Sequence, residues 1–187
     1  MGMTFNFKTA GKVKITMDGF VKELLEDCRE IIGVSPTPAK PDLFLMKPTA
    51  LDPLISTSSR EYFHSITAKL LYLSKRSRPD ILTSVAFLTK RVTIPQRDDM
   101  KKLERTIQYV RGTKDFALTL EAHDPIIVTC YIDASYGVHA DKKSHTGCAI
   151  TLGEGTIYAK SATQKFNTKS STEAELVGLS DASNQAI

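Results

Sequence analysis

Two short acidic runs are the best candidates for chemistry in this chain. Tyr131-Ile-Asp-Ala-Ser-Tyr-Gly137 places Asp133 at the end of an apolar run, and Ser170-Ser-Thr-Glu-Ala-Glu-Leu176 places Glu175 in the first turns of a helix. Mg²⁺ prefers hard carboxylate ligands and keeps several of its waters, so this pair suits metal-assisted phosphodiester hydrolysis. A separation of the two carboxyl groups beyond about 10 Å would exclude a shared ion.

Each carboxylate also has an ordinary interpretation. Asp133 could be a turn residue that caps Ser135 or Gly137 at a strand end, and Glu175 could be a surface glutamate of a helix. Glu173 competes with Glu175 for the metal-binding role. It occupies the fourth position of a Ser-x-x-Glu capping box, where its side chain should reach back to the Ser170 N–H.

A basic stretch between residues 75 and 114 is the second candidate feature. It contains eleven Lys/Arg and four Asp/Glu, a net charge of +7, within a chain whose overall charge is only +4. Such a surface can bind phosphate in a salt-dependent way, although a solvated helical face has the same composition. The candidate nucleic-acid contacts are Lys75, Arg76, Arg78, Lys101, Lys102 and Arg105.

The cysteines and histidines offer no recognisable metal site. Cys28, Cys130 and Cys148 have no CxxC spacing and form an odd set, which argues against a disulfide framework or a zinc site. The four histidines also lack metal-ligand spacing. No apolar stretch approaches 18 residues and the first residues do not resemble a signal peptide, so we expect no membrane partner and an intracellular, cytoplasmic protein.

The elements that must position these residues follow from local patterns. Alternation over residues 4–8 and 13–17, around a turn with Gly11, predicts a β-hairpin. Asp18 is the expected cap of a short helix. Five prolines between residues 35 and 57 predict an extended connector along the surface.

The central third is predicted to be a bundle of three amphipathic helices. Ser58 and Glu61 fit a capping box for the first helix, Pro79 opens the second, and Gly112 ends a third that begins near Asp98. Their apolar faces recur at helical spacing. The expected inward residues are Tyr62, Ile66, Leu70, Leu73, Ile81, Val85, Leu88, Val92, Leu103, Ile107 and Val110.

The last third is predicted to contain three strands and a helix. The near-continuous apolar run from Ile126 to Ile132 is typical of a strand buried on both faces. Residues 147–152 and 156–159 flank a Gly-Glu-Gly turn and should form a hairpin. The fold class is therefore α+β: a β-hairpin, a small helical bundle, and a β-β-β-α unit.

Several short runs, taken in order, resemble copia-type retrotransposon Pol polyproteins. Tyr72-Leu73 with Arg78-Pro-Asp-Ile81 is similar to the family's LLYL…RPDI helix pair, and Tyr109-Val-Arg-Gly-Thr113 to its YLKGT. The opening Met1-Gly-Met-Thr is similar to the hairpin that closes the polymerase palm. Tyr131-Ile-Asp-Ala-Ser, Lys143-Ser-His-Thr-Gly147 and the run to Glu175 resemble the start of the ribonuclease H region.

The resemblance implies a reverse transcriptase/ribonuclease H. Residues 1–17 would end the palm, and residues 18–120, with the connector at 35–57, would form a thumb-like and connecting region on the template–primer duplex. Residues 125–187 would begin a truncated ribonuclease H-like domain that cuts the RNA strand of an RNA–DNA hybrid. Asp133 and Glu175 would be its catalytic, Mg²⁺-binding carboxylates. The partners would be the nucleic acid and the rest of the polyprotein, in the cytoplasm, the nucleus or a virus-like particle.

We expect little or no activity from this chain by itself. The polymerase motif Tyr/Phe-x-Asp-Asp is absent, and Asp98-Asp99 lies at a helix start, where a helix-dipole role is expected. The family's third carboxylate lies on a later strand. Asp181 is a poor substitute, since six residues place it about 120° around the helix and about 9 Å along it from Glu175. The alternatives are a non-catalytic nucleic-acid-binding module and a degenerate retroelement remnant.

Overall fold

The computed structural model describes residues 2–48 and 50–185, and Met1, Thr49, Ala186 and Ile187 lie outside the described residues. The chain divides into two compact units. Unit 1 contains Thr16–Ala117 together with the residues up to Thr4, and unit 2 contains Phe5–Ile15 and the chain from Leu118 onward. The predicted mixed α and β composition is confirmed, with five α-helices and two antiparallel sheets among the described residues.

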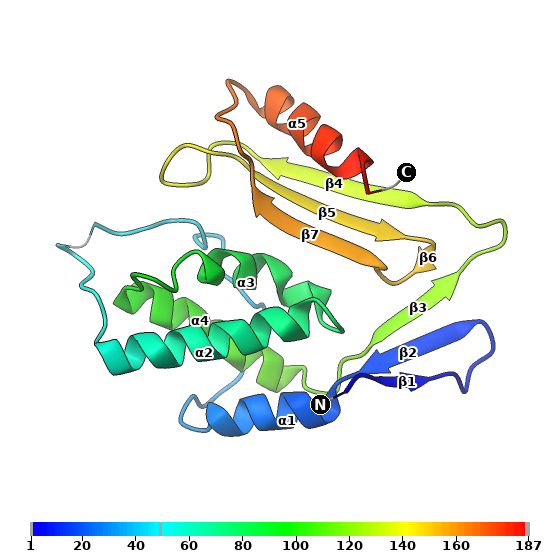
Figure 1. Cartoon of the computed structure of the whole chain (residues 1–187), viewed down its shortest axis with the longest axis horizontal. Coiled ribbons are helices and arrows are strands. Elements are labelled where there is room, and N and C mark those ends of the chain that lie inside the picture. Colours follow the sequence, from blue (N-terminus) through cyan, green and yellow to red (C-terminus); the bar gives the residue numbers. More distant parts are fainter. Residues whose placement is uncertain (1, 49, 186–187) are drawn as a thin grey trace. The chain divides into compact units, whose positions relative to one another are not determined.

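Unit 1 is the predicted helical bundle (Figure 1). Its elements are α1 (Asp18–Asp27), α2 (Thr57–Ser74), a 3₁₀ turn (Pro79–Ile81), α3 (Leu82–Thr89) and α4 (Arg97–Gly112). The apolar residues predicted to face inward do so, because a stripe at 3.6-residue spacing can leave water only by packing against its neighbours. The core includes Phe20, Leu24, Phe63, Ile66, Leu70, Leu73, Val85, Leu88, Leu103, Ile107 and Val110.

Two predicted helix caps were wrong by one or two residues. Met17, not Asp18, is the N-cap of α1, and Asp18 is its first helical residue. The cap of α2 is Ser56, whose hydroxyl accepts a hydrogen bond from the Ser59 N–H, so the Ser58–Glu61 capping box does not form. Serines two positions apart give equivalent local signals, and the packing of the α2 apolar face decides which of them caps the helix.

The proline-rich connector is irregular, as predicted, and α4 and its N-cap hold it along much of its length. Lys102 Nζ donates to the Leu45 carbonyl at 2.6 Å, and Thr106 Oγ1 to the Pro38 carbonyl at 3.1 Å. The Gln96 amide donates to the carbonyls of Lys47 and Asp52. The connector therefore packs against α4 as part of unit 1, and these hydrogen bonds fix its conformation.

Unit 2 contains two antiparallel sheets. The predicted N-terminal hairpin is confirmed as β1 (Thr4–Asn6) and β2 (Lys12–Thr16). It belongs to a sheet of order β1-β2-β3-β6 with β3 (Leu118–Ala122) and β6 (Gly153–Glu154). Sequence reasoning assigned no strand to residues 118–122, and the pairing of Val13 with Leu120 shows that they complete the hairpin sheet.

The second sheet has the order β4-β5-β7 and is accompanied by α5. The strands are β4 (Thr129–Ser135), β5 (His145–Thr151) and β7 (Tyr158–Thr163), and α5 spans Ser171–Ser183. The predicted hairpin is confirmed by the pairing of β5 with β7. The predicted strand at 126–132 was misplaced and is not buried on both faces: Ile126 is 68% exposed, Tyr131 is 63% exposed, and β4 forms an edge of its sheet. None of the described helices combines the length and the hydropathy of a membrane span.

Candidate functional site

Asp133 lies in β4, an edge strand of the three-stranded sheet. It pairs with Gly147 of the neighbouring strand, and its side chain is exposed. Side chains alternate between the two faces of a strand. Ile132 lies on the face that α5 covers, because a Cβ at Gly178 of this helix would be 3.5 Å from Ile132 Cγ2. The Asp133 side chain therefore lies on the face opposite to α5, in an edge strand and not in a strand that is buried on both faces as predicted.

α5 lies beside β4 (Figure 1), and Glu175 of this helix contacts the strand. Its Oε1 accepts a hydrogen bond from the Ala134 N–H at 3.3 Å. Since Ala134 N and the Asp133 Cα are separated by one carbonyl carbon, standard bond lengths keep the Asp133 carboxyl carbon within about 8 Å of this oxygen. The two carboxylates thus lie around one edge of the sheet, where a shared ion is geometrically allowed.

The start of α5 is fixed by local and tertiary contacts. Ser170 is the N-cap and accepts from the Glu173 N–H at 3.1 Å, as predicted. The reciprocal half of the capping box was wrong, because the Glu173 carboxylate accepts from the Lys169 N–H at 2.6 Å instead of from Ser170. The Glu173 carboxylate is therefore bonded to the backbone N–H of the residue before the N-cap. Glu175 is the helix carboxylate that contacts β4.

Gln164 is a positioning residue that sequence reasoning missed. Its side chain is 2% exposed, and its Nε2 donates to the Ala174 carbonyl at 2.8 Å and to Thr146 Oγ1 at 2.9 Å. These bonds join the first turns of α5 to β5. Its position directly after a strand was the available signal, but a single glutamine there has no distinctive pattern.

The described residues do not complete a metal cluster around this pair. No group of three or more His, Cys, Asp or Glu side chains in the described part of the chain could hold a metal ion. Asp181 is half-buried near the end of α5, consistent with the helical spacing that separates it from Glu175. The site therefore offers two carboxylates as metal ligands, those of Asp133 and Glu175.

Two histidines that look unrelated in the sequence meet on the Asp133 face of the sheet. A ring nitrogen of His139 lies 3.0 Å from His145 Nδ1, and His145 Nε2 lies 2.7 Å from Ser161 Oγ. Residue 145 pairs with Ser135 across β4 and β5, which places its side chain on the same face as Asp133. This cluster joins the loop after β4 to β5 and β7, and the six-residue spacing gave no sign of it.

The six predicted nucleic-acid contacts are in very different surroundings. Arg78 is 2% exposed; it forms an ion pair with Asp80 at 2.8 Å and donates to Thr113. Its guanidinium is bonded within unit 1, and Arg78 is the least exposed of the six candidates. Lys75, Arg76 and Lys101 are exposed, whereas Lys102 and Arg105 are half-buried against the connector.

The acidic pair Asp98-Asp99 is structural, as the sequence indicated. Both residues lie in the first turn of α4. Asp99 is 3% exposed, binds Arg91 Nε at 2.9 Å, and accepts from the Gln96 N–H at 2.8 Å. Asp98 lies between Lys47 and Lys102, at 2.9 and 3.0 Å. Burial opposes ionisation of Asp98, but these lysines outweigh it and hold its pKa below the usual value.

Comparison with known proteins finds homologues among transposon polyproteins. It is 27% identical over 186 residues to the retrovirus-related Pol polyprotein from transposon TNT 1-94 of Nicotiana tabacum, covering 96% of this chain and 14% of that protein. It is 30% identical over 152 residues to that from transposon RE1 of Arabidopsis thaliana, covering 81% and 10%. Pol polyproteins of plant transposons are thus homologues at modest identity, which confirms the resemblance at that level.

A third relative is short. The secreted RxLR effector protein 161 of Plasmopara viticola is 27% identical over 124 residues, which is 66% of this chain and 87% of that protein. No family model matches the chain, and no solved structure matches it. The chain spans only a small part of the polyproteins it resembles.

Proposed function

We propose that this chain supplies the connecting region and the first part of the ribonuclease H region of a copia-type reverse transcriptase. In the complete protein it would bind template–primer or RNA–DNA hybrid and take part in cleavage of the RNA strand. The observation that carries this proposal is the approach of Glu175 to the Ala134 N–H, one residue from Asp133, at an open strand edge. The chain's homologues among Pol polyproteins support the assignment.

The residues present fit a hydrated Mg²⁺ ion. Asp133 and Glu175 are exposed and have hard oxygen atoms, which this ion prefers while keeping its remaining waters. When bound, the ion would lower the pKa of its water and stabilise charge on the phosphate. The chain's own contribution is orientation: the Ala134 N–H fixes the Glu175 carboxylate, and Gln164 fixes the helix turn that carries it.

Two carboxylates fall short of the ligand set that two ions about 3.5–4 Å apart require. We therefore expect weak binding of one ion and little or no cleavage by this chain alone. RNA cleavage would depend on further carboxylates supplied by the rest of a polyprotein.

Binding of Mg²⁺ can be followed by amide NMR shifts in β4 and α5. We expect saturable shifts at Ala134 and Glu175 that are lost in Asp133→Asn and in Glu175→Gln. Asp181→Asn is the matched control on the same helix, and it should keep the wild-type shifts. If both site variants respond to Mg²⁺ as the wild type does, the carboxylate pair is not a metal site and the proposal fails.

The second candidate is a non-catalytic nucleic-acid-binding module. It is favoured by the +7 charge of residues 75–114 and by the exposure of Arg76 and Lys101. Fluorescence anisotropy with an RNA–DNA hybrid would test it. Each lost phosphate contact should weaken binding and reduce the salt slope by about 1, so Arg76→Ala and Lys101→Ala should bind less well than Arg60→Ala, a control on an exposed turn of α2. Equal affinity of all four proteins would exclude this module.

A further inference from the structure

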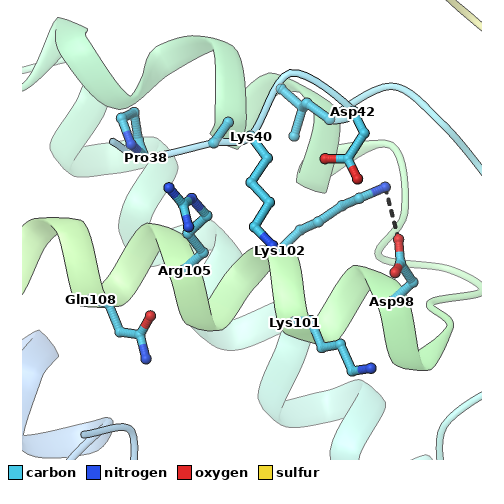
Figure 2. A pocket seen from close by; sticks show the side chains of 10 residues that line it. Pro38, Lys40, Asp42, Asp98, Lys101, Lys102, Arg105 and Gln108 are labelled. Atoms are coloured by element: carbon cyan, nitrogen blue, oxygen red, sulfur yellow. Dashed lines mark ion pairs between the residues drawn. The ribbon is translucent and has the colours of Figure 1, made fainter. Parts of the chain in front are cut away.

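A pocket of about 230 Å³ lies between the proline-rich connector and α4, within unit 1 (Figure 2). Its walls come from residues 38–43 and from the face of α4 between Asp98 and Gln108. Pro38, Ala39 and Leu43 form the apolar part of the lining. At this size it suits a single small charged group better than a drug-sized ligand, which needs about 300–1,000 Å³.

The pocket walls are held in place by hydrogen bonds that do not involve a ligand. An Arg105 guanidinium NH₂ donates to Thr37 Oγ1 at 2.8 Å, and Thr106 Oγ1 donates to the Pro38 carbonyl at 3.1 Å. Farther along the connector, Lys102 Nζ donates to the Leu45 carbonyl at 2.6 Å. The connector and helix are thus fastened at both ends of the pocket, so its shape is preorganised.

The charges around the pocket are unbalanced. Lys102 and Asp98 neutralise each other at 3.0 Å, as the dashed line in Figure 2 marks. The remaining charged lining residues are Lys40, Lys101 and Arg105 against Asp42. Within the described residues Lys40 and Lys101 form no ion pair, so the pocket carries uncompensated positive charge.

Arg105 contributes a half-buried cation to the pocket wall. Its Nε is buried and has no hydrogen-bond partner among the described residues. Figure 2 shows Arg105 reaching from α4 toward Pro38 while Lys40 extends from the connector toward α4. An anion between the two side chains would face positive charge from both walls of the pocket.

We propose that this pocket binds a phosphate group, with Lys40 Nζ and the Arg105 guanidinium as its donors. Arginine's planar fork suits phosphate oxygens, and the lysine ammonium adds a charge that can adjust its position. The group could belong to a free phosphorylated compound or to a nucleic-acid strand, since both present the same oxygens. The pocket is built from unit 1 alone and does not depend on Asp133 and Glu175.

Isothermal titration of the full chain at low salt tests this, with inorganic pyrophosphate and a short single-stranded oligodeoxynucleotide as the two probes. We expect Lys40→Ala and Arg105→Lys to weaken binding about tenfold, as expected for loss of a charge-assisted hydrogen bond. Asp42→Asn should tighten it, because it removes the opposing charge. Arg60→Ala is the control for a lost cation elsewhere in unit 1.

The two probes distinguish the source of the phosphate. Pyrophosphate binding that weakens in Lys40→Ala assigns the pocket to a free phosphorylated compound, and oligonucleotide binding alone, with the same sensitivity, assigns it to a strand. If neither probe binds, or if the pocket variants match Arg60→Ala, the pocket is not a phosphate site. Asp133→Asn should leave every result unchanged, so failure here is separate from failure of the proposed ribonuclease H role.

Discussion

Replacing Asp99 by alanine should destabilise unit 1 more than any surface substitution. The Asp99 and Arg91 side chains are 4% and 10% exposed, and their ion pair measures 2.9 Å. Asp99 Oδ2 also accepts the Gln96 N–H at 2.8 Å, which completes the capping box of α4. Removing one member of a buried pair leaves the other charge uncompensated, so we expect a loss of about 3–5 kcal/mol in the free energy of unfolding.

Part of the Arg91 guanidinium would stay bonded, which sets the lower end of this range. Arg91 also donates to the Ile94 carbonyl and to Gln96 Oε1, each at 3.2 Å. Asp99→Asn keeps the shape and one acceptor, and should cost less than Asp99→Ala. The effect should extend to the connector, because Gln96 donates to the Asp52 carbonyl at 2.7 Å.

Urea denaturation followed by helical circular dichroism would measure the loss. Glu61→Ala, an exposed acid on α2, is the matched control and should change the unfolding free energy by less than about 0.5 kcal/mol. Amide hydrogen exchange at residues 96–99 would show whether the helix start has opened. A loss below about 1 kcal/mol for Asp99→Ala would refute the argument, since it would mean that the pair contributes no more than an exposed one.

Three further outcomes are expected. Gln164→Leu should lower the stability of unit 2 by about 1–3 kcal/mol, since its bonds to Thr146 and Ala174 are lost; unchanged denaturation would contradict this. Gly155→Ala should weaken the β3–β6 pairing by about 1–3 kcal/mol, because Gly155 has φ +74° and a Cβ there would lie 1.9 Å from the Thr119 carbonyl oxygen. Faster amide exchange in β3 would show this loss. The lowered pKa of Asp98 makes its stabilisation complete above the usual carboxyl pKa of about 3.9 and lost as pH falls through the lower folded value. Asp98→Asn should therefore flatten the acid limb of melting temperature against pH, and an identical limb would count against the two-lysine contact.

The helices could be predicted from the sequence because the spacing of apolar residues that indicates a helix is local. Ile66, Leu70 and Leu73 recur at helical spacing, and each is buried in α2. The N-caps were harder to predict, since Ser56 and Ser58 are chemically equivalent candidates two positions apart. Which of them caps the helix depends on the packing of α2 against its neighbours, and local sequence does not encode this.

The strands were harder to predict because their burial depends on partners that are distant in the chain. Ile126 to Val128 are apolar but exposed, and β4 begins only at Thr129. β3 was missed because its pairing with β2 joins residues about a hundred positions apart. An apolar run shows that burial is favourable, but it does not show which face or which partner provides it.

The sequence by itself determined the types and order of most elements, the basic stretch, and the choice of Asp133 and Glu175 as candidate carboxylates. Only the tertiary structure decided that Glu175 reaches the backbone beside Asp133 around a strand edge, that Arg78 is buried, and that Lys40 and Arg105 face one pocket. The physical reason is that periodicity and capping act within a few residues, whereas these contacts join segments more than 30 residues apart, whose approach is set by the packing of whole elements.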